Sequence, residues 1–306
     1  MLMRAALDAA RIGFPVFPLR PGDKRPAFPN HPADDCDLTD PRCRAAEQHV
    51  GWEPRATTDP HRIGRAWSAG PYNVGIACGP ARLVVVDLDV PKPDQTCPAE
   101  WRIDGVRDGS DVFAVLCERA GQPWPVTYTV RTGRGGWHVY FHHPAGPALR
   151  NTTGALGWLV DTRAAGGYVV GAGSVVAGRP YTVEADAEVA PLPAWLAQSL
   201  TPQPERAAGP VAVILPPDRR GGYLGAALDR SARAVRESGA ERHNAALFGA
   251  ACSLGELVAG GELTDDQVLA VLLPAALDVG QPRGEALRTI RSGLRHGARR
   301  PRSVAA

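Results

Sequence analysis

The stretch Leu83-Val84-Val85-Val86-Asp87-Leu88-Asp89-Val90 joins an apolar, β-branched run to two aspartates. Such a run predicts a buried strand, and residues two apart in a strand point to the same face. Asp87 and Asp89 would then leave a hydrophobic core side by side. Because like charges held so close repel each other and resist desolvation, a bound cation is the usual way to make the pair favourable, and oxygen ligands suit Mg²⁺ or Mn²⁺. The alternative is that the strand ends at Asp87 and both acids are solvated turn residues.

Two later segments carry related chemistry. The turn Thr132-Gly133-Arg134-Gly135-Gly136 offers backbone amides to a phosphate, and strand alternation places His138 and Tyr140 on one face of the strand that follows. A hairpin with a half-buried histidine is the alternative, and the glycine spacing fits neither the dinucleotide-binding nor the Walker pattern. Asp161 ends another apolar run and would supply a third acid to a two-metal site. Arg163 would share its face and contact phosphate.

The whole chain has the composition of a globular protein. Its 306 residues are 44% hydrophobic, enough for two domains, and no apolar stretch approaches the ~20 residues that span a bilayer. The first ten residues predict a helix and not a signal peptide, so we expect a cytoplasmic protein without membrane contact. In that compartment the six cysteines would be reduced or bound to metal.

The expected fold class is α+β. Residues 1–200 predict a domain built on mixed or antiparallel sheets, 201–217 a linker rich in Pro and Ala, and 218–306 a small all-α domain. Helices are predicted at 5–11 and 59–67. The predicted strands are 14–19, 73–77, 83–87, 126–131, 137–141, 158–162, 168–170 and, as the last, 179–183. We expect 73–77 to pair with 83–87, and 126–131 to form a hairpin with 137–141.

The C-terminal segment predicts helices and a basic surface. Thr264 and Gln267 match a capping box, and a helix over 285–295 would carry arginines on one face. This basic stripe suits the backbone of a DNA template, which it would bind by counterion release, although a solvated helix end with a loose terminus is the alternative. The arginines concerned are Arg288, Arg291, Arg295, Arg299 and Arg300.

A polar insertion at 31–49 contains four candidate zinc ligands. His31, Cys36, Cys43 and His49 follow the spacing His-x4-Cys-x6-Cys-x5-His, in a segment with little else to fold it. The spacing is not that of a standard zinc finger, and an ordinary polar loop is the alternative.

Taken in order, these motifs resemble the archaeo-eukaryotic primase superfamily, and most closely its bifunctional primase–polymerase (Prim-Pol) branch from mobile elements. The motifs are apolar-Asp87-Leu88-Asp89, Gly135-Gly136-Trp137-His138 and apolar-Asp161. The segments on either side of these motifs also resemble those of the family. Residues from about 5 to 200 carry the resemblance. Relatives often have two prolines before the position of Ser174, where this chain has Val170-Gly171-Ala172-Gly173.

The resemblance implies a role for each motif residue. Asp87, Asp89 and Asp161 would bind Mg²⁺ or Mn²⁺ and, with His138, form the catalytic centre. The same relatives imply Zn²⁺ in an insertion. The residues expected to bind the nucleotide, beside His138, are Lys24, Thr132, Arg134, Gly135, Gly136, Arg163 and Ser174.

The implied function is template-directed nucleotidyl transfer from NTPs or dNTPs on single-stranded DNA, in replication of a mobile element or plasmid. Because no Walker motif occurs, any helicase would be a separate protein. Two rivals are a gap-filling nucleotidyltransferase of DNA repair and a catalytically weak, nucleic-acid-binding replication accessory.

Overall fold

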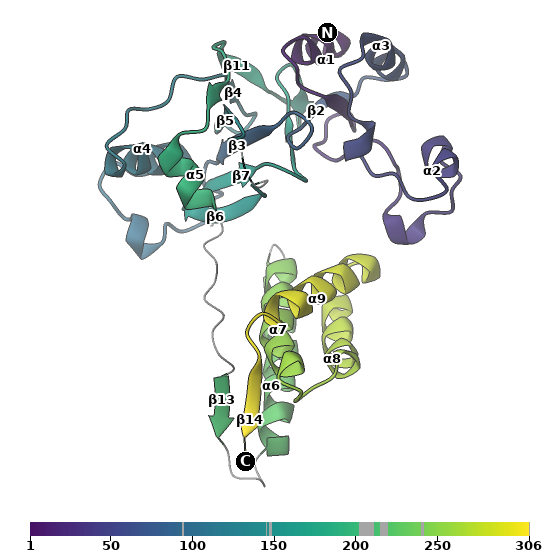
Figure 1. The fold of residues 1–306 in the computed structure, drawn as a ribbon, viewed down its shortest axis with the longest axis vertical. Coiled ribbons are helices and arrows are strands. Elements are labelled where there is room, and N and C mark those ends of the chain that lie inside the picture. Colours follow the sequence, from purple (N-terminus) through teal and green to yellow (C-terminus); the bar gives the residue numbers. More distant parts are fainter. Residues whose placement is uncertain are drawn as a thin grey trace. The chain divides into compact units, whose positions relative to one another are not determined.

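The computed structural model describes residues 1–93, 95–144, 146, 149–201, 211–214, 220–239 and 242–305, without the side chains of 211–214, 220 and 305. The chain divides into two compact units, Met1–Pro202 and Gln203–Ala306 (Figure 1). Sheets and short helices make up the first unit, and helices dominate the second. The fold is therefore α+β, as predicted. Most of the expected linker, 201–217, lies outside the described residues.

The first unit is organised around a sheet of seven strands. Its strands run in the order β11-β4-β5-β3-β7-β6, with β12 beside β5. The β4–β5 hairpin is confirmed, because the two strands pair antiparallel through Thr129↔Val139 and Arg131↔Trp137. The bounds are β3 Leu83–Leu88, β4 Thr129–Arg131, β5 Trp137–His142, β6 Thr152–Gly157, β7 Val160–Arg163, β11 Thr182–Ala185 and β12 Ala190–Pro191.

A second sheet in this unit has the order β1-β2-β8, with β1 Val16–Leu19, β2 Asn73–Ala77 and β8 Tyr168–Val170. The predicted pairing of 73–77 with 83–87 is therefore wrong, since β2 pairs with β1 and β8 while β3 pairs with β5 and β7. A tight helical turn separates β2 from β3: Ala81 N donates to Ala77 O (3.2 Å), and Arg82 adopts a φ of 52°. This turn redirects the chain into the other sheet.

Helices cover both sheets. On the three-stranded sheet lie α1 (Leu2–Arg11) and α3 (Pro60–Ser68), the latter capped by Asp59 as predicted. Against one face of the large sheet pack α4 (Gly109–Arg119) and α5 (Ala194–Leu200) (Figure 1).

Strand alternation divides the side chains of β3 between two cores. Val84, Val86 and Leu88 are buried against α4 and α5, and each stabilises the fold by about 1.5–3 kcal/mol. Leu83 and Val85 face the three-stranded sheet instead. Asp87, two residues further on, shares the face of Val85.

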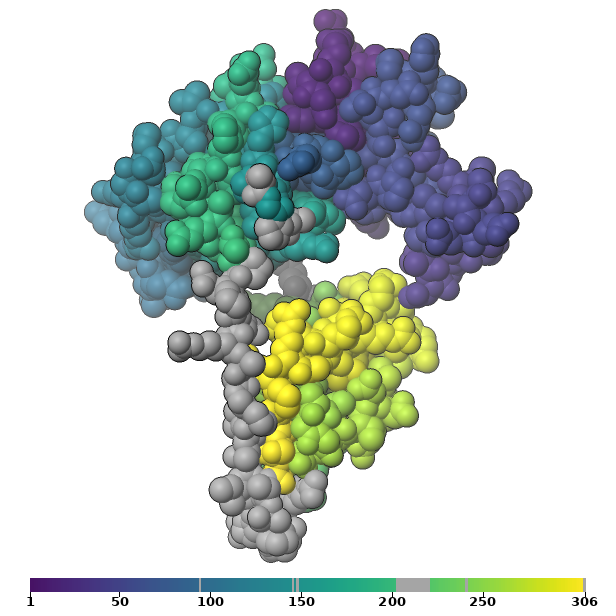
Figure 2. All heavy atoms as spheres, in the orientation of Figure 1, coloured from purple at the N-terminus to yellow at the C-terminus, as the bar shows by residue number. Residues whose placement is uncertain are grey.

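A lobe of unit 1 carries the polar insertion. It contains α2 (Pro41–Ala45) and short 3₁₀ turns at Ala33–Asp35 and Glu53–Arg55, and it lies at one edge of the unit (Figures 1 and 2). Among residues 31–50 only Cys43 is buried. The lobe therefore has almost no hydrophobic core.

The second unit contains α6 (Arg220–Arg236), α7 (His243–Ala259), α8 (Asp265–Asp278) and α9 (Arg283–Gly297). The capping box at the start of α8 is confirmed. A parallel strand pair, β13 (Val211–Ile214) with β14 (Arg302–Ala305), was not predicted. The short strand β12 was not predicted either. The expectation that 179–183 is the last strand was therefore wrong. Nowhere in the described chain is a helix both long and apolar enough to cross a membrane.

Candidate active site

Strand register brings the central acidic residue between two other predicted site residues. In the antiparallel pairs of β3, Asp87 lies opposite His138 of β5 on one side and opposite Asp161 of β7 on the other. The Nε2 atom of His138 lies 3.5 Å from Asp87 Oδ1. Directly opposed residues in a sheet have their side chains on one face. The sheet thus gathers these three side chains, which lie more than 70 residues apart in the sequence from first to last.

One arginine neutralises part of the resulting negative charge. Arg163 Nη2 lies 3.1 Å from Asp161 Oδ2 and 3.6 Å from Asp87 Oδ2. Asp161 Oδ1 also accepts a hydrogen bond from Gly154 N (3.0 Å). Burial raises the pKa of Asp87, with a further contribution from the charge of Asp161, while Arg163 opposes the rise. Two carboxylates share one guanidinium, and this arrangement favours an added cation.

The third carboxylate belongs to Asp89, which lies two residues after Asp87 and just beyond the end of β3. Its backbone is fixed from two directions: Asp89 N donates to Leu159 O, and Gly109 N, at the start of α4, donates to Asp89 O (both 2.9 Å). Partial burial of its carboxylate and the charges of Asp87 and Asp161 raise the pKa of Asp89. Asp89 lines one pocket with Asp161, which lies opposite Asp87, and the three carboxylates together form an acidic centre.

His138 is a neutral imidazole in this environment. Its side chain is 7% exposed, and burial, with the charge of Lys24, lowers its pKa to about 3. Its Nδ1 atom has no hydrogen-bond partner within the described part of the chain. A buried polar atom of this kind is costly unless a ligand satisfies it.

Two pockets flank the acidic centre. The inner pocket encloses about 320 Å³ and contains Asp87 and His138 together with basic and aromatic side chains. Its glycine edge, Gly166-Gly167, follows β7. The residues lining it are Lys24, Trp52, Asp87, His138, Asn151, Arg163, Gly166, Gly167, Tyr168, Val169, Val170 and Tyr181.

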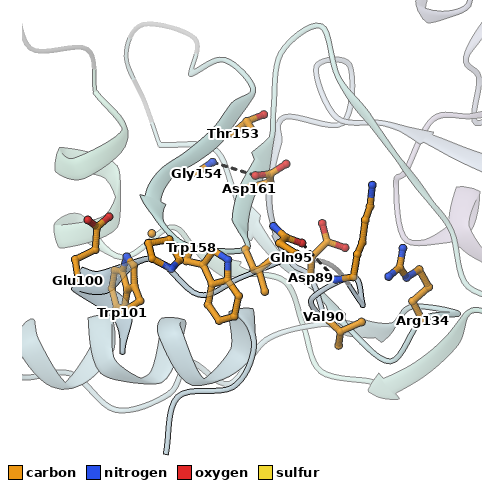
Figure 3. A pocket seen from close by; sticks show the side chains of 14 residues that line it. Asp89, Val90, Gln95, Glu100, Trp101, Arg134, Thr153, Gly154, Trp158 and Asp161 are labelled. Atoms are coloured by element: carbon orange, nitrogen blue, oxygen red, sulfur yellow. Dashed lines mark hydrogen bonds between the residues drawn. The ribbon is translucent and has the colours of Figure 1, made fainter. Parts of the chain in front are cut away.

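The outer pocket encloses about 450 Å³ and contains the other two acids, Asp89 and Asp161 (Figure 3). Trp101 and Trp158 lie along one side of it, and Arg134 lies near Asp89 on the other (Figure 3). The acidic centre therefore borders two separate spaces. Both contain aromatic side chains and basic groups, but the outer pocket is also lined by Glu100 in addition to Asp89 and Asp161, whereas Asp87 is the one carboxylate among the lining residues of the inner pocket.

The β4–β5 turn contributes its residues unequally. Arg134 lines the outer pocket, whereas Thr132, Gly135 and Gly136 line neither pocket. A Cβ on Gly136 would collide with the carbonyl of Leu88, so the turn packs directly on the end of β3. Its glycine therefore helps to place the backbone next to Asp89.

Ser174 is placed differently from the other predicted nucleotide-binding residues. Its side chain is fully buried, and its Oγ accepts a hydrogen bond from Val74 N (2.9 Å) in β2. It does not line the inner pocket, where Lys24, His138 and Arg163 lie.

The four predicted zinc ligands lie together in the lobe. One ligand atom from each of His31, Cys36, Cys43 and His49 lies within 4.8 Å of the others. The cluster can hold a metal ion, and it shares no residue with the two pockets.

In unit 2, the predicted basic stripe is exposed. It follows α9 and the turn after it, and all five of its arginines face solvent to a large degree: Arg288, Arg291, Arg295, Arg299 and Arg300.

The sequence reasoning missed several residues of the inner pocket. Trp52, Asn151 and Tyr181 belong to no motif, and only the three-dimensional packing brings them together. Tyr168 had a signal in the sequence, because it follows the Gly166-Gly167 pair directly.

Residues 6–195, more than half of the chain, match the family model described as the N-terminal domain of bifunctional DNA primase/polymerase (Prim-Pol). No curated protein matches the chain.

Proposed function

This chain belongs to the Prim-Pol family, and from that premise we propose that it is a DNA-dependent primase and polymerase. In this proposal it performs template-directed nucleotidyl transfer from NTPs or dNTPs on single-stranded DNA, in replication of a mobile element or plasmid. The observation that carries the proposal is the register that sets Asp87 between His138 and Asp161.

The three carboxylates are the proposed ligands of Mg²⁺ or Mn²⁺. Asp87, Asp89 and Asp161 offer only oxygen atoms, which are the ligands these cations prefer. The raised pKa values of Asp87 and Asp89 mean that their negative charge is unfavourable here, and a bound cation would relieve that cost. When bound, the ions lower the pKa of the attacking 3′ hydroxyl and neutralise charge on the triphosphate.

The inner pocket is the proposed site of the triphosphate. Lys24 and Arg163 supply positive charge there, and the backbone of Gly166-Gly167 permits close approach. Neutral His138 retains one N–H, which can donate to a phosphate oxygen. In the transfer step the 3′ oxygen bonds to the α-phosphorus and pyrophosphate leaves, so these groups both position the nucleotide and stabilise the leaving group.

Three further roles belong to the proposal. The exposed arginines of α9 bind the backbone of the template, Arg134 contacts nucleic acid or nucleotide from the outer pocket, and Zn²⁺ in the His/Cys cluster is a structural ion with no part in the transfer step. A helicase, if one acts with this protein, is a separate chain.

Incorporation of labelled nucleotide tests the proposal on primed and unprimed single-stranded DNA. We expect activity that depends on Mg²⁺ or Mn²⁺ and is lost, by about 10³-fold or more, in Asp87→Ala/Asp89→Ala. Equal activity of that variant and wild type would refute the catalytic assignment. Extension without priming would leave a gap-filling polymerase, and binding of DNA without incorporation by wild type would indicate a replication accessory.

A further inference from the structure

We propose that Zn²⁺ bound by His31, Cys36, Cys43 and His49 fixes residues 49–55 and thereby positions Trp52, a wall of the inner pocket. The inference rests on the proposed function in one respect, namely that the inner pocket receives the nucleotide. It makes the lobe a positioning device for nucleotide binding, separate from the Mg²⁺ or Mn²⁺ centre.

The spacing of the four ligands fits one tetrahedral ion. His31 Nε2 lies 3.2 Å from Cys36 Sγ and 3.8 Å from Cys43 Sγ. With Zn–S of about 2.3 Å and Zn–N of about 2.0–2.1 Å, tetrahedral geometry separates a sulfur and a nitrogen ligand by about 3.5 Å. His49 Nδ1 is buried and lacks a hydrogen-bond partner in the described chain, so it is the natural fourth donor.

Two N–H donors lie around the sulfur of Cys43. Its Sγ accepts a hydrogen bond from Val50 N (3.3 Å) and lies 3.6 Å from Arg55 Nη2. Donors around ligating sulfur orient the ligand and stabilise its negative charge. Val50 directly follows the ligand His49, so the same short segment supplies both a ligand and a supporting amide.

The lobe needs a source of folding free energy other than a core. Cys43 is its only buried residue between positions 31 and 50. Segments this poor in apolar contacts commonly fold through metal binding, which then contributes directly to their stability.

An arginine whose side chain is largely covered links the cluster to the segment that leads into the pocket. Arg55 donates to both carboxylate oxygens of Asp40 (2.8 and 3.2 Å), the N-cap of α2, and to the carbonyl of Val50 (2.9 and 3.0 Å). Only 10% of its side chain is exposed. Residues 50 and 55 are thereby tied to the helix that carries Cys43.

Trp52 lies inside this closed segment. Its ring centroid is 4.8 Å from that of Phe17 and 4.9 Å from that of Tyr168, and Trp52 and Tyr168 both line the inner pocket. Trp52 lies three positions after the ligand His49 and three positions before Arg55. Loss of the ion would release the chain on the pocket's aromatic side without touching Asp87 or His138.

The test combines metal analysis with a double-mutant cycle on the full-length protein. Zinc content is measured for wild type, Cys36→Ser, Cys36→His and Trp52→Ala, with Cys252→Ser in unit 2 as the matched control. The dissociation constant of dATP with Mg²⁺ is then measured for each, and for Cys36→Ser/Trp52→Ala. Cys36→His retains four zinc ligands, so it separates loss of the ion from loss of the cysteine.

We expect one zinc per chain in wild type, Cys36→His, Trp52→Ala and Cys252→Ser, and less in Cys36→Ser. Cys36→Ser and Trp52→Ala should each weaken dATP binding about tenfold, and the double variant about tenfold and not a hundredfold, because both changes remove the same wall. Wild type without stoichiometric zinc overturns the metal site. Unchanged dATP binding in Cys36→Ser, or fully multiplicative effects, overturns the coupling while the proposed function stands. Absence of dATP binding by zinc-loaded wild type overturns both.

Discussion

Replacing Asp87 with Asn is expected to stabilise the metal-free protein and to weaken its response to metal. Asp87 is opposed by Asp161 across the β3–β7 pair, and burial raises its pKa. Its ionised form therefore costs stability at neutral pH. Like charges directly opposed in a sheet cost about 0.2–1 kcal/mol, which for a unit of this size corresponds to about 1–4 °C in melting temperature. Asn keeps the size of the side chain, and Arg163 keeps its closer partner, Asp161.

The pH dependence has a defined sign. Since the folded-state pKa of Asp87 is raised, the folded protein binds this proton more tightly than the unfolded chain does. The cost is absent at acid pH and develops as pH rises above the unfolded value of about 3.9. The advantage of Asp87→Asn over wild type should therefore grow from acid towards neutral pH.

Tryptophan fluorescence measures this stability in the full-length protein, because all seven tryptophans lie between residues 52 and 195. Mn²⁺ at about 100 times its dissociation constant should stabilise wild type by about 2.7 kcal/mol and the variant by much less. Asp104→Asn, which removes an exposed carboxylate outside both pockets, is the control and should match wild type. A variant that melts below wild type without metal, or that gains as much from Mn²⁺, would refute the reasoning.

Three other perturbations test separate parts of the structure. Arg55→Met should destabilise the lobe by about 3 kcal/mol, because it leaves the Asp40 carboxylate without its charged partner. Since Arg55 lowers the pKa of Asp40, the advantage of wild type in thermal melts should be full above about pH 4 and shrink below it. A pH-independent difference would contradict this. Gly136→Ala should reduce nucleotide incorporation at least tenfold, since the added methyl group collides with the Leu88 carbonyl beside the acidic centre. Full activity of this variant would show that the β4–β5 turn can move away from β3 without loss of function. The variant Arg288→Gln/Arg291→Gln/Arg295→Gln removes three charges from α9. For single-stranded DNA, the slope of log binding constant against log salt concentration should become shallower by about 2, as measured by fluorescence anisotropy. An unchanged slope would exclude this surface as a site of DNA binding.

The sequence predicted which of these side chains share one face of the sheet, because side chains alternate along a strand. The apolar runs before Asp87 and Asp161 mark two strands, and Asp87 lies next to last in β3 while Asp161 lies within β7. A two-residue period is enough to put His138 with Tyr140, and Asp161 with Arg163, on common faces. The β4–β5 hairpin followed from its glycine turn. Both signals depend only on residues close together in the sequence, and the folded structure keeps the local arrangement that they predict.

Long-range pairing was harder to predict. Two apolar strands separated by a short glycine-containing turn resemble a hairpin, but the helical turn at 77–82 sends β2 and β3 into different sheets. Trp52 joins the inner pocket only through packing on Phe17 and Tyr168, which no local pattern encodes. The strand pairing of β14 depends on a partner some 90 residues earlier in the chain.

The most direct test of the central claim is a crystal structure of the protein with Mn²⁺ and a non-hydrolysable nucleoside triphosphate, with the ions located by their anomalous scattering. The account predicts Mn²⁺ within about 2.2 Å of carboxylate oxygens of Asp87, Asp89 and Asp161. It also predicts the triphosphate in the inner pocket, in contact with Lys24, His138 and Arg163. Mn²⁺ bound elsewhere, or a triphosphate outside that pocket, would contradict it.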